Sequence, residues 1–235
     1  MTTALYLIPV TIGDTPLAQV LPAYNSEVIR GISHFVVEEI RTARRFLKQV
    51  DKSIDIDALH FYPMGKHADE ALYAQYLAPL AQGQSVGVIS EAGCPGVADP
   101  GAAIAAIAHR MGHSVVPLVG PSSILLALMA SGCNGQSFAF NGYLPVDPTG
   151  RTARLKRLET LATADGQTQL FIETPYRNVK MWEDILRTLR PTTKVCIAAG
   201  ITTPTEIIRT LSVAEWKKRP TPEIAKVPAI FIIGG

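Results

Sequence analysis

The chain has 235 residues, of which 47% are apolar, and a formal net charge of +2. This length and composition allow one large globular domain or two small ones. The small net charge gives no support to a dedicated nucleic-acid-binding domain, which is usually strongly basic. The three cysteines, Cys94, Cys133 and Cys196, form no Cys-x-x-Cys pair, so we expect no disulfide framework and no metal site. Because the apolar N-terminal stretch lacks a basic start and no run is long enough to span a bilayer, we expect a cytoplasmic protein without membrane contact.

The first half of the chain alternates short β-rich runs with segments of helical length. The runs cover residues 5–9, 85–89 and 114–119, and each leads into a turn that contains glycine or proline. This alternation predicts a parallel sheet. Residues 27–50 carry an approximate apolar stripe at helical spacing, which predicts one long helix.

The second half has more strands and less regular spacing. Residues 138–140, 169–173, 195–199, 206–210 and 229–233 are all β-rich. The third and fourth of these runs are so close that only a hairpin joins them, so this sheet should be mixed. Ser212-Val213-Ala214-Glu215 has the form of a capping box and predicts a final helix. We therefore predict an α/β protein with two domains, residues 1–118 with a parallel sheet and residues 119–235 with a mixed sheet.

Three turns follow the strands of the first half, at residues 10–14, 90–101 and 119–123. In open α/β sheets, ligands bind at the carboxyl ends of the strands. The three glycines of the middle turn allow a ligand to approach the backbone closely. The alternative is purely structural, with Asp99 as the N-cap of a helix and Pro100 as its first residue. The usual glycine-rich signatures for dinucleotides and phosphates are absent from the chain.

Five motifs occur in order along nearly the whole chain: Leu7-Ile8-Pro9-Val10-Thr11-Ile12-Gly13, the segment 90–101, Val116-Pro117-Leu118-Val119-Gly120-Pro121-Ser122-Ser123, Gly142-Tyr143-Leu144-Pro145 and Phe171-Ile172-Glu173-Thr174-Pro175-Tyr176-Arg177. Together they resemble the tetrapyrrole methylase superfamily, and most of all its ribosomal RNA small-subunit methyltransferase I branch. The resemblance implies a two-domain α/β fold, a homodimer, and S-adenosylmethionine bound in a cleft between the domains.

The resemblance also implies which residues contact the cofactor. The three turns supply Pro9, Gly13, Gly93, Cys94, Pro95, Val97, Ala98, Asp99, Ser122 and Ser123. Tyr143 and Leu144 would pack near the adenosine, and Ala198, Ala199, Pro228 and Ala229 match positions that approach the adenine.

The chain departs from the ribosomal branch at three elements. An acidic-Asp-Thr-Arg element appears as Glu38-Glu39-Ile40-Arg41, an Ala-Arg-Glu element as Ala198-Ala199-Gly200, and a Gly-Glu pair as Pro228-Ala229. Because charged groups are lost from the expected cleft, the methyl acceptor stays open.

Methyl transfer from a sulfonium is an in-line displacement, so aligning the acceptor with the methyl group supplies much of the acceleration. A hydroxyl acceptor also needs a base. We expect the catalytic residues to be Glu39, Arg41 and Glu173. His67 is a further candidate base or substrate contact, and Arg177 a contact for an anionic substrate. The alternative for each carboxylate is a structural ion pair with a neighbouring arginine, or for Glu173 a bond to backbone amides.

A basic run, Arg151, Arg154, Lys156 and Arg157, is suited to phosphates, or else forms a solvated helix face. The leading hypothesis is a methyltransferase that acts on ribosomal RNA or the small ribosomal subunit, at a ribose 2′-hydroxyl. The alternatives are methylation of a small molecule such as a tetrapyrrole, and a cofactor-binding homologue without turnover.

Overall fold

The computed structural model describes residues 2–64 and 70–234. The chain divides into two compact units, Met1–Ser122 and Ser123–Gly235. Within the described residues each unit is built on a five-stranded sheet. The predicted α/β class, with a parallel first sheet and a mixed second sheet, is confirmed. The predicted domain boundary after residue 118 stays a prediction.

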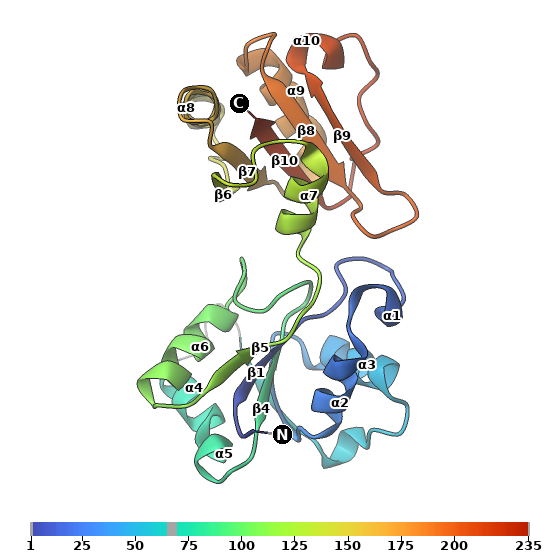
Figure 1. Cartoon of the computed structure of the whole chain (residues 1–235), viewed down its shortest axis with the longest axis vertical. Coiled ribbons are helices and arrows are strands. Elements are labelled where there is room, and N and C mark those ends of the chain that lie inside the picture. The colour runs from blue at the N-terminus through green and yellow to red at the C-terminus, as the bar shows by residue number, and fades with distance from the viewer. Residues whose placement is uncertain (1, 65–69, 235) are drawn as a thin grey trace. The chain divides into compact units, whose positions relative to one another are not determined.

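The first unit is a parallel sheet between two helical layers. Its strands run in the order β3-β2-β4-β1-β5. Helices α2 and α3 cover one face, and α4, α5 and α6 cover the other (Figure 1). Side chains from both faces of the strands are buried, as is typical of parallel sheets. The elements are β1 (Leu5–Ile8), α1 (Leu17–Val20), α2 (Ala23–Arg30), β2 (His34–Val37), α3 (Ile40–Val50), β3 (His60–Pro63), α4 (Glu70–Tyr76), α5 (Ala78–Ala81), β4 (Val86–Ile89), α6 (Gly101–Arg110) and β5 (Val115–Pro117).

The predicted long helix over residues 27–50 is wrong. Helix α2 ends at Arg30, strand β2 follows, and α3 begins only after Glu39. Phe35 of β2 and Phe46 of α3 lie in the same buried cluster. Apolar residues at an approximate helical spacing therefore come from three separate elements that share one core. The turn at Gly31 and the β-prone run at residues 34–37 were the signals for a break.

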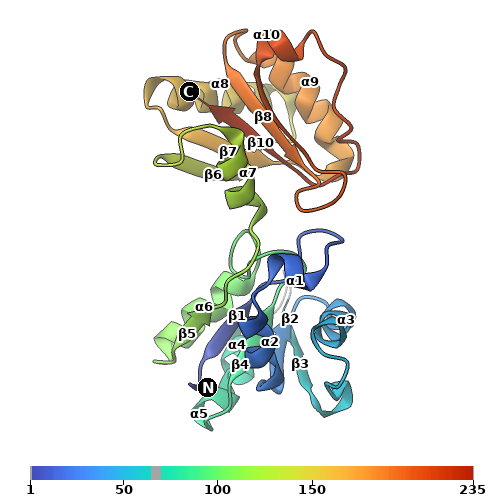
Figure 2. The same cartoon turned by 45° about the vertical axis from the view of Figure 1, so that its right-hand side comes forward.

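The second unit is a mixed sheet with strand order β6-β7-β10-β8-β9. Strands β6 and β7 are parallel, and the other neighbouring pairs are antiparallel. Helix α7 lies on one face, with α8 and α9 on the other (Figure 2). The predicted hairpin, β8–β9, and the capping box at Ser212 are confirmed. The elements are α7 (Ser123–Ser131), β6 (Phe138–Tyr143), α8 (Pro148–Ala164), β7 (Thr168–Ile172), α9 (Asn178–Thr188), β8 (Lys194–Ala199), β9 (Ile207–Ser212), α10 (Val213–Trp216) and β10 (Ala229–Gly234).

Strand β2 begins with a buried histidine that makes stability depend on pH. The His34 ring stacks on His60 with centroids 4.7 Å apart, and its nitrogens lie 2.9 Å from Tyr62 Oη and 3.1 Å from Gln84 Oε1. Burial, followed by the charge of His60, lowers the pKa of His34 from 6.5, against a smaller opposing effect of Gln84. As the pH falls below 6.5, the unfolded chain binds a proton before the native state does, so the free energy of unfolding should decrease. Above that pH the contribution of the neutral His34 side chain to the free energy of unfolding is fully present.

Urea denaturation at about pH 7.5 and about pH 5.5 tests this effect. We expect His34→Gln to lose less stability between the two conditions than the unsubstituted protein. The control is His109→Gln, at an exposed position of α6, which should leave the pH dependence unchanged. Equal losses in all three proteins would contradict the assignment to His34.

Candidate functional site

Three loops meet at the carboxyl edge of the first sheet, where β4, β1 and β5 are neighbours. The amide of Val10 donates to the Gly93 carbonyl at 3.0 Å, and the two residues form an isolated antiparallel bridge. The Cys94 thiol lies 3.3 Å from the Pro121 carbonyl oxygen and donates to it. The loops that follow β1, β4 and β5 are thereby bonded to one another, which brings Pro9, Gly93 and Cys94 of the predicted cofactor residues together.

The loops pack so closely that Gly120 has no room for a side chain and Gly93 has little. A Cβ on Gly120 would lie 2.2 Å from Pro9 Cγ, and one on Gly93 would lie 3.2 Å from Ile12 Cγ2. Gly93 also has a φ of 71°, and Ala98 has a φ of 62°. A left-handed alanine costs roughly 1–2 kcal/mol, so the surrounding contacts must hold this loop in place.

Asp99 organises the middle loop and leaves one oxygen without a partner. Its Oδ1 accepts from the amides of Gly96 at 2.6 Å and Gly101 at 2.7 Å. Its Oδ2 is buried and has no hydrogen-bond partner within residues 2–64 and 70–234. Helix α6 is assigned from Gly101 with Pro100 before it, but Pro100 already has helical dihedrals and the Asp99 carboxylate accepts from the Gly101 amide, so Asp99 acts as the predicted cap. A buried acceptor without a donor is suited to a ligand N–H or O–H group.

Cys94 is a packing and hydrogen-bonding residue of these loops. Burial, together with the nearby carboxylate of Asp99, raises the pKa of the Cys94 thiol. The thiol therefore stays protonated near neutral pH and is unsuited to act as a nucleophile.

Glu39 and Arg41 lie at the start of α3, beside the middle loop. Glu39 is the N-cap, and its Oε1 accepts from the Arg41 amide at 3.1 Å. Thr42 donates to the Glu91 carboxylate, and the Glu91 amide donates to Glu38 Oε1 at 3.3 Å. The Arg41 side chain is exposed and makes no ion pair with any residue that the structure describes. The alternative of a structural ion pair between Arg41 and a neighbouring carboxylate is therefore not seen within the described part of the chain.

Glu38, the first carboxylate of the Glu38-Glu39-Ile40-Arg41 element, was not among the predicted site residues but also lies at this edge. Burial raises the pKa of its carboxyl group, and the carboxylates of Asp99 and Glu91 add to the increase against the hydrogen bond from the Glu91 amide. Only the fold brings these residues together, because Glu38 and Glu91 are far apart in the sequence.

In the second unit, two candidate residues bind each other. Glu173 Oε1 accepts from the Thr174 amide at 2.6 Å and from Arg177 Nη2 at 2.7 Å. The hydrogen bonds and charge of Glu173 raise the pKa of the Arg177 guanidinium. Glu173 thus makes both of the structural interactions given as its alternative, an ion pair with a neighbouring arginine and a hydrogen bond from a backbone amide. Leu144 is buried, whereas Tyr143 is exposed. The further candidate His67 lies outside the described residues.

The four predicted adenine contacts lie together at one end of the second sheet. Ala199 of β8 pairs with Ala229 of β10, and the Gly200 amide donates to the Pro228 carbonyl at 3.0 Å. The side chains of Ala198, Ala199 and Ala229 are buried. The Ala199–Ala229 pair therefore adds no charge to this buried end of the sheet.

The predicted basic run of α8 is only partly available to phosphates. Arg151 is buried in an ion pair with Asp184, at 2.5 Å from Nη2 to Oδ2. Arg154 donates to the Asn141 side chain at 2.8 Å. Lys156 and Arg157 are exposed, so two of the four cations are free to face a polyanion.

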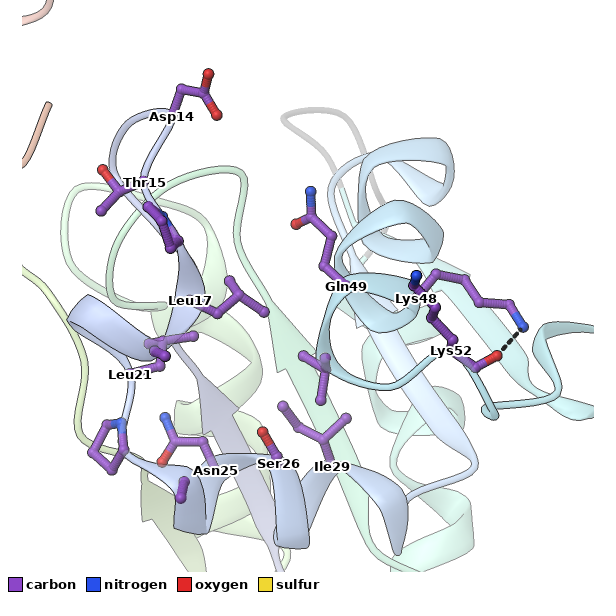
Figure 3. A pocket seen from close by; sticks show the side chains of 15 residues that line it. Asp14, Thr15, Leu17, Leu21, Asn25, Ser26, Ile29, Lys48, Gln49 and Lys52 are labelled. Atoms are coloured by element: carbon purple, nitrogen blue, oxygen red, sulfur yellow. Dashed lines mark hydrogen bonds between the residues drawn. The ribbon is translucent and has the colours of Figure 1, made fainter. Parts of the chain in front are cut away.

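A groove of about 860 Å³ lies elsewhere on the first unit, between α1, α2 and the end of α3 (Figure 3). None of the predicted cofactor residues lines it. Within the described residues, no group of three His, Cys, Asp or Glu side chains is placed to hold a metal ion. No helix in that part of the chain is long and apolar enough to cross a membrane.

Comparison with known proteins decides the family. Ribosomal RNA small subunit methyltransferase I of Escherichia coli O157:H7 is 30% identical to this chain over 211 residues, which are 90% of this chain and 70% of the relative. The protein of the same name from Vibrio cholerae is 30% identical over 212 residues, with 90% and 69% covered. That from Mesorhizobium japonicum is 33% identical over 207 residues, with 88% and 66% covered. The chain belongs to the ribosomal RNA small subunit methyltransferase I family. The predicted family and the assignment as a methyltransferase are confirmed.

No family model matches the chain. The crystal structure of the methyltransferase CobJ aligns with a TM-score of 0.64 at 18% identity, over 100% of this chain and 95% of the other. Uroporphyrin-III-C-methyltransferase from Thermus thermophilus aligns with a TM-score of 0.54 at 20% identity, over 100% and 93%. At these identities the likeness shows that this chain shares the fold of these two methyltransferases.

Proposed function

We propose that this chain transfers the methyl group of S-adenosylmethionine to a ribose 2′-hydroxyl of small-subunit ribosomal RNA. The observation that carries the proposal is the meeting of the three loops at the carboxyl edge of the first sheet, in a chain of the ribosomal RNA small subunit methyltransferase I family. This edge is the usual ligand site of open α/β sheets.

The loop chemistry fits a ligand with ammonium and hydroxyl donors. The unpartnered Oδ2 of Asp99 can accept from the ammonium or ribose hydroxyl of S-adenosylmethionine. The neutral Cys94 thiol presents no competing nucleophile to a sulfonium. The proposed contacts from the three loops are Pro9, Gly13, Gly93, Cys94, Pro95, Val97, Ala98, Asp99, Ser122 and Ser123. In the second unit the proposal includes Tyr143, Leu144, Ala198, Ala199, Pro228 and Ala229.

When bound, S-adenosylmethionine supplies the electrophilic methyl group. We assign the removal of the hydroxyl proton to Glu39, whose Oε1 is fixed by the Arg41 amide while Oε2 makes no hydrogen bond within the described residues. The exposed Arg41 guanidinium can bind a neighbouring phosphate. Arg177 has the same capacity, and Glu173 holds its guanidinium in place. Glu173 is therefore a positioning residue in this scheme.

Ribosomal RNA is favoured over a tetrapyrrole as the acceptor. The relatives at about 30% identity carry the ribosomal RNA name, whereas the two solved methyltransferases share the fold at 18% and 20% identity. Such a substrate also implies the cytoplasmic location expected from the sequence. The homodimer stays a prediction, which light scattering of the purified protein tests.

Calorimetric titration with S-adenosylmethionine tests the cofactor site. Val97 is an exposed residue of the middle loop, so Val97→Trp should preserve the fold and cover the site. We expect about 10-fold weaker binding or more, a change of about 1.4 kcal/mol. The control is Met111→Trp, at an exposed position just after α6, which should bind normally.

Transfer of labelled methyl groups to purified small ribosomal subunits then tests the acceptor. We expect label in the ribosomal RNA, and less of it with Val97→Trp. Cofactor binding without transfer to subunits or to tetrapyrroles would contradict the proposed reaction and support a homologue without turnover. Equal cofactor binding by Val97→Trp and the unsubstituted protein would contradict the proposed site.

A further inference from the structure

Helix α3 presents five cationic side chains along one side, which we call the basic stripe: Arg41, Arg44, Arg45, Lys48 and, just after the helix, Lys52. At about 100° per residue, the four members within the helix fall in an arc of about 100°. The opposite side carries the buried Ala43, Phe46 and Leu47. All five cations are exposed, so the stripe faces solvent along the whole helix.

The stripe is not neutralised by neighbouring carboxylates. Helix α3 contains no Asp or Glu, and no stripe residue forms an ion pair with any residue that the structure describes. On α9, by contrast, Lys180 and Arg187 both pair with Asp184. An unpaired row of cations is the electrostatic pattern that binds a phosphate backbone.

The groove runs beside the stripe and continues toward the proposed cofactor loops. Gln49 extends over it from α3, while Leu17, Leu21 and Ile29 point into it from the facing helices (Figure 3). Asp14 and Thr15, at the end of the first loop, also line it. The lining combines these apolar side chains with the amides of Gln49 and Asn25 and with Lys48 and Lys52 of the stripe. Such a lining is suited to an unstacked base, whose faces are apolar and whose edges form hydrogen bonds.

We propose that the basic stripe binds the phosphate backbone of the RNA substrate and that the groove holds an unstacked base of the same strand. This inference rests on the proposed function. Helix α3 has 11 residues and is therefore about 16 Å long, enough for several consecutive phosphates. Its first turn is bonded to the middle loop through Thr42 and Glu91, so a strand on the stripe passes directly to the loops that we assign to the cofactor.

Two of the five stripe residues are suited to a clean test. Lys48 also donates to the carbonyls of Lys52 and Ile54, and the Arg44 guanidinium lies 5.3 Å from the centroid of the Phe61 ring. Arg41 belongs to the proposed catalytic machinery. Arg45 and Lys52 make no side-chain bond with a described residue that would be lost on substitution.

The test compares the double variant Arg45→Gln/Lys52→Gln with Lys156→Gln/Arg157→Gln, which removes the same charge from the exposed cations of α8. The α8 variant is the control for net charge and also tests the competing phosphate-binding surface. Binding to purified small ribosomal subunits and to a single-stranded fragment of their RNA is measured over a range of KCl concentrations. We expect the stripe variant to bind about 10-fold more weakly, with a salt slope lower by about 1.4, or about 0.7 for each lost phosphate contact. The control variant should match the unsubstituted protein.

The groove is tested with Gln49→Ala against Gln19→Ala, an exposed residue of α1 that does not line it. We expect Gln49→Ala to weaken binding of the fragment several-fold without changing the salt slope, because no phosphate contact is lost. The Gln19 variant should bind normally. Unchanged binding by Gln49→Ala would overturn the assignment of the groove.

Calorimetry with S-adenosylmethionine separates this inference from the proposed function. Normal cofactor and RNA binding by the Arg45/Lys52 variant overturns the stripe alone, as does an equal loss in the α8 control. Unsubstituted protein that binds the cofactor but no RNA overturns both the stripe and the proposed acceptor. A further outcome is that the unsubstituted protein binds anionic phosphatidylglycerol vesicles and no RNA, with weaker vesicle binding by the Arg45/Lys52 variant. That result overturns RNA as the partner of the stripe.

Discussion

Replacement of Asp184 by alanine is expected to lower the free energy of unfolding by about 3–5 kcal/mol, because it leaves a buried guanidinium without its counter-charge. The Arg151 and Asp184 side chains are 6% and 2% exposed, and their ion pair is 2.5 Å long. The Asp184 carboxylate also binds Lys180 and Arg187 from its own helix. The Arg151 guanidinium keeps only one other hydrogen bond within the described residues, to the Val146 carbonyl, so it cannot recover the lost interaction inside the fold.

Urea denaturation of Asp184→Ala and Glu183→Ala measures the effect. Glu183 is the neighbouring carboxylate, and its side chain is 59% exposed with a single long ion pair to Lys180, so its loss should cost at most about 1 kcal/mol. Similar losses in both variants would contradict a dominant role for the buried pair.

The same carboxylate should contribute to acid sensitivity. Burial raises the pKa of Asp184, but the hydrogen bonds and charges of Arg151 and Lys180 outweigh burial, so the net pKa lies below 3.8. Its stabilising contribution is therefore present above pH 3.8 and is lost as the pH falls through the lowered value. Asp184→Ala should lack this part of the acid transition.

The sequence predicted the fold class because local patterns report which residues become strands and which become loops. Residues 5–9 and 85–89 were recognisable from β-prone runs that end in turns, and they form β1 and β4. The pattern failed over residues 27–50, where three elements pack into one core and their apolar residues mimic a helical period. Strand β3 was also missed, because it is a short edge strand whose residues are exposed or only partly buried.

The sequence predicted the loops of the candidate site better than their internal bonds. Strand order places the ends of β1, β4 and β5 side by side, and the loop contacts follow from that order. The partner of Arg151 could not be predicted, because Asp184 is 33 residues further along the chain. The same holds for Glu38 and Glu91, which are 53 residues apart. Such pairs depend on tertiary packing, which a local pattern does not encode.

Gly120→Ala is the substitution that should most directly disturb the candidate cofactor site. The added methyl group would lie 2.2 Å from Pro9 Cγ and 2.3 Å from Pro9 Cβ. Because the Pro9 ring is closed on the backbone, it cannot rotate away, and the loops after β1 and β5 must separate. We expect a loss of about 1–3 kcal/mol in the free energy of unfolding and at least about 10-fold weaker binding of S-adenosylmethionine.

Gly135→Ala is the matched control, since a Cβ there has no neighbouring atom within 4 Å. It should leave both the stability and the cofactor affinity nearly unchanged. A Gly120→Ala variant that binds the cofactor normally would show that the spacing of these two loops does not control the site.

Combination with Pro9→Gly distinguishes the clash from other effects at Gly120. Glycine at position 9 removes both proline atoms that the new methyl group would meet, although by itself it costs stability by loosening the unfolded chain. If the clash is the cause, Gly120→Ala should cost much less in the Pro9→Gly background than in the unsubstituted protein. The difference is the coupling energy of the double-mutant cycle. Additive losses would instead mean that the loops fail for separate reasons, and that the contact between Pro9 and Gly120 does not set their spacing.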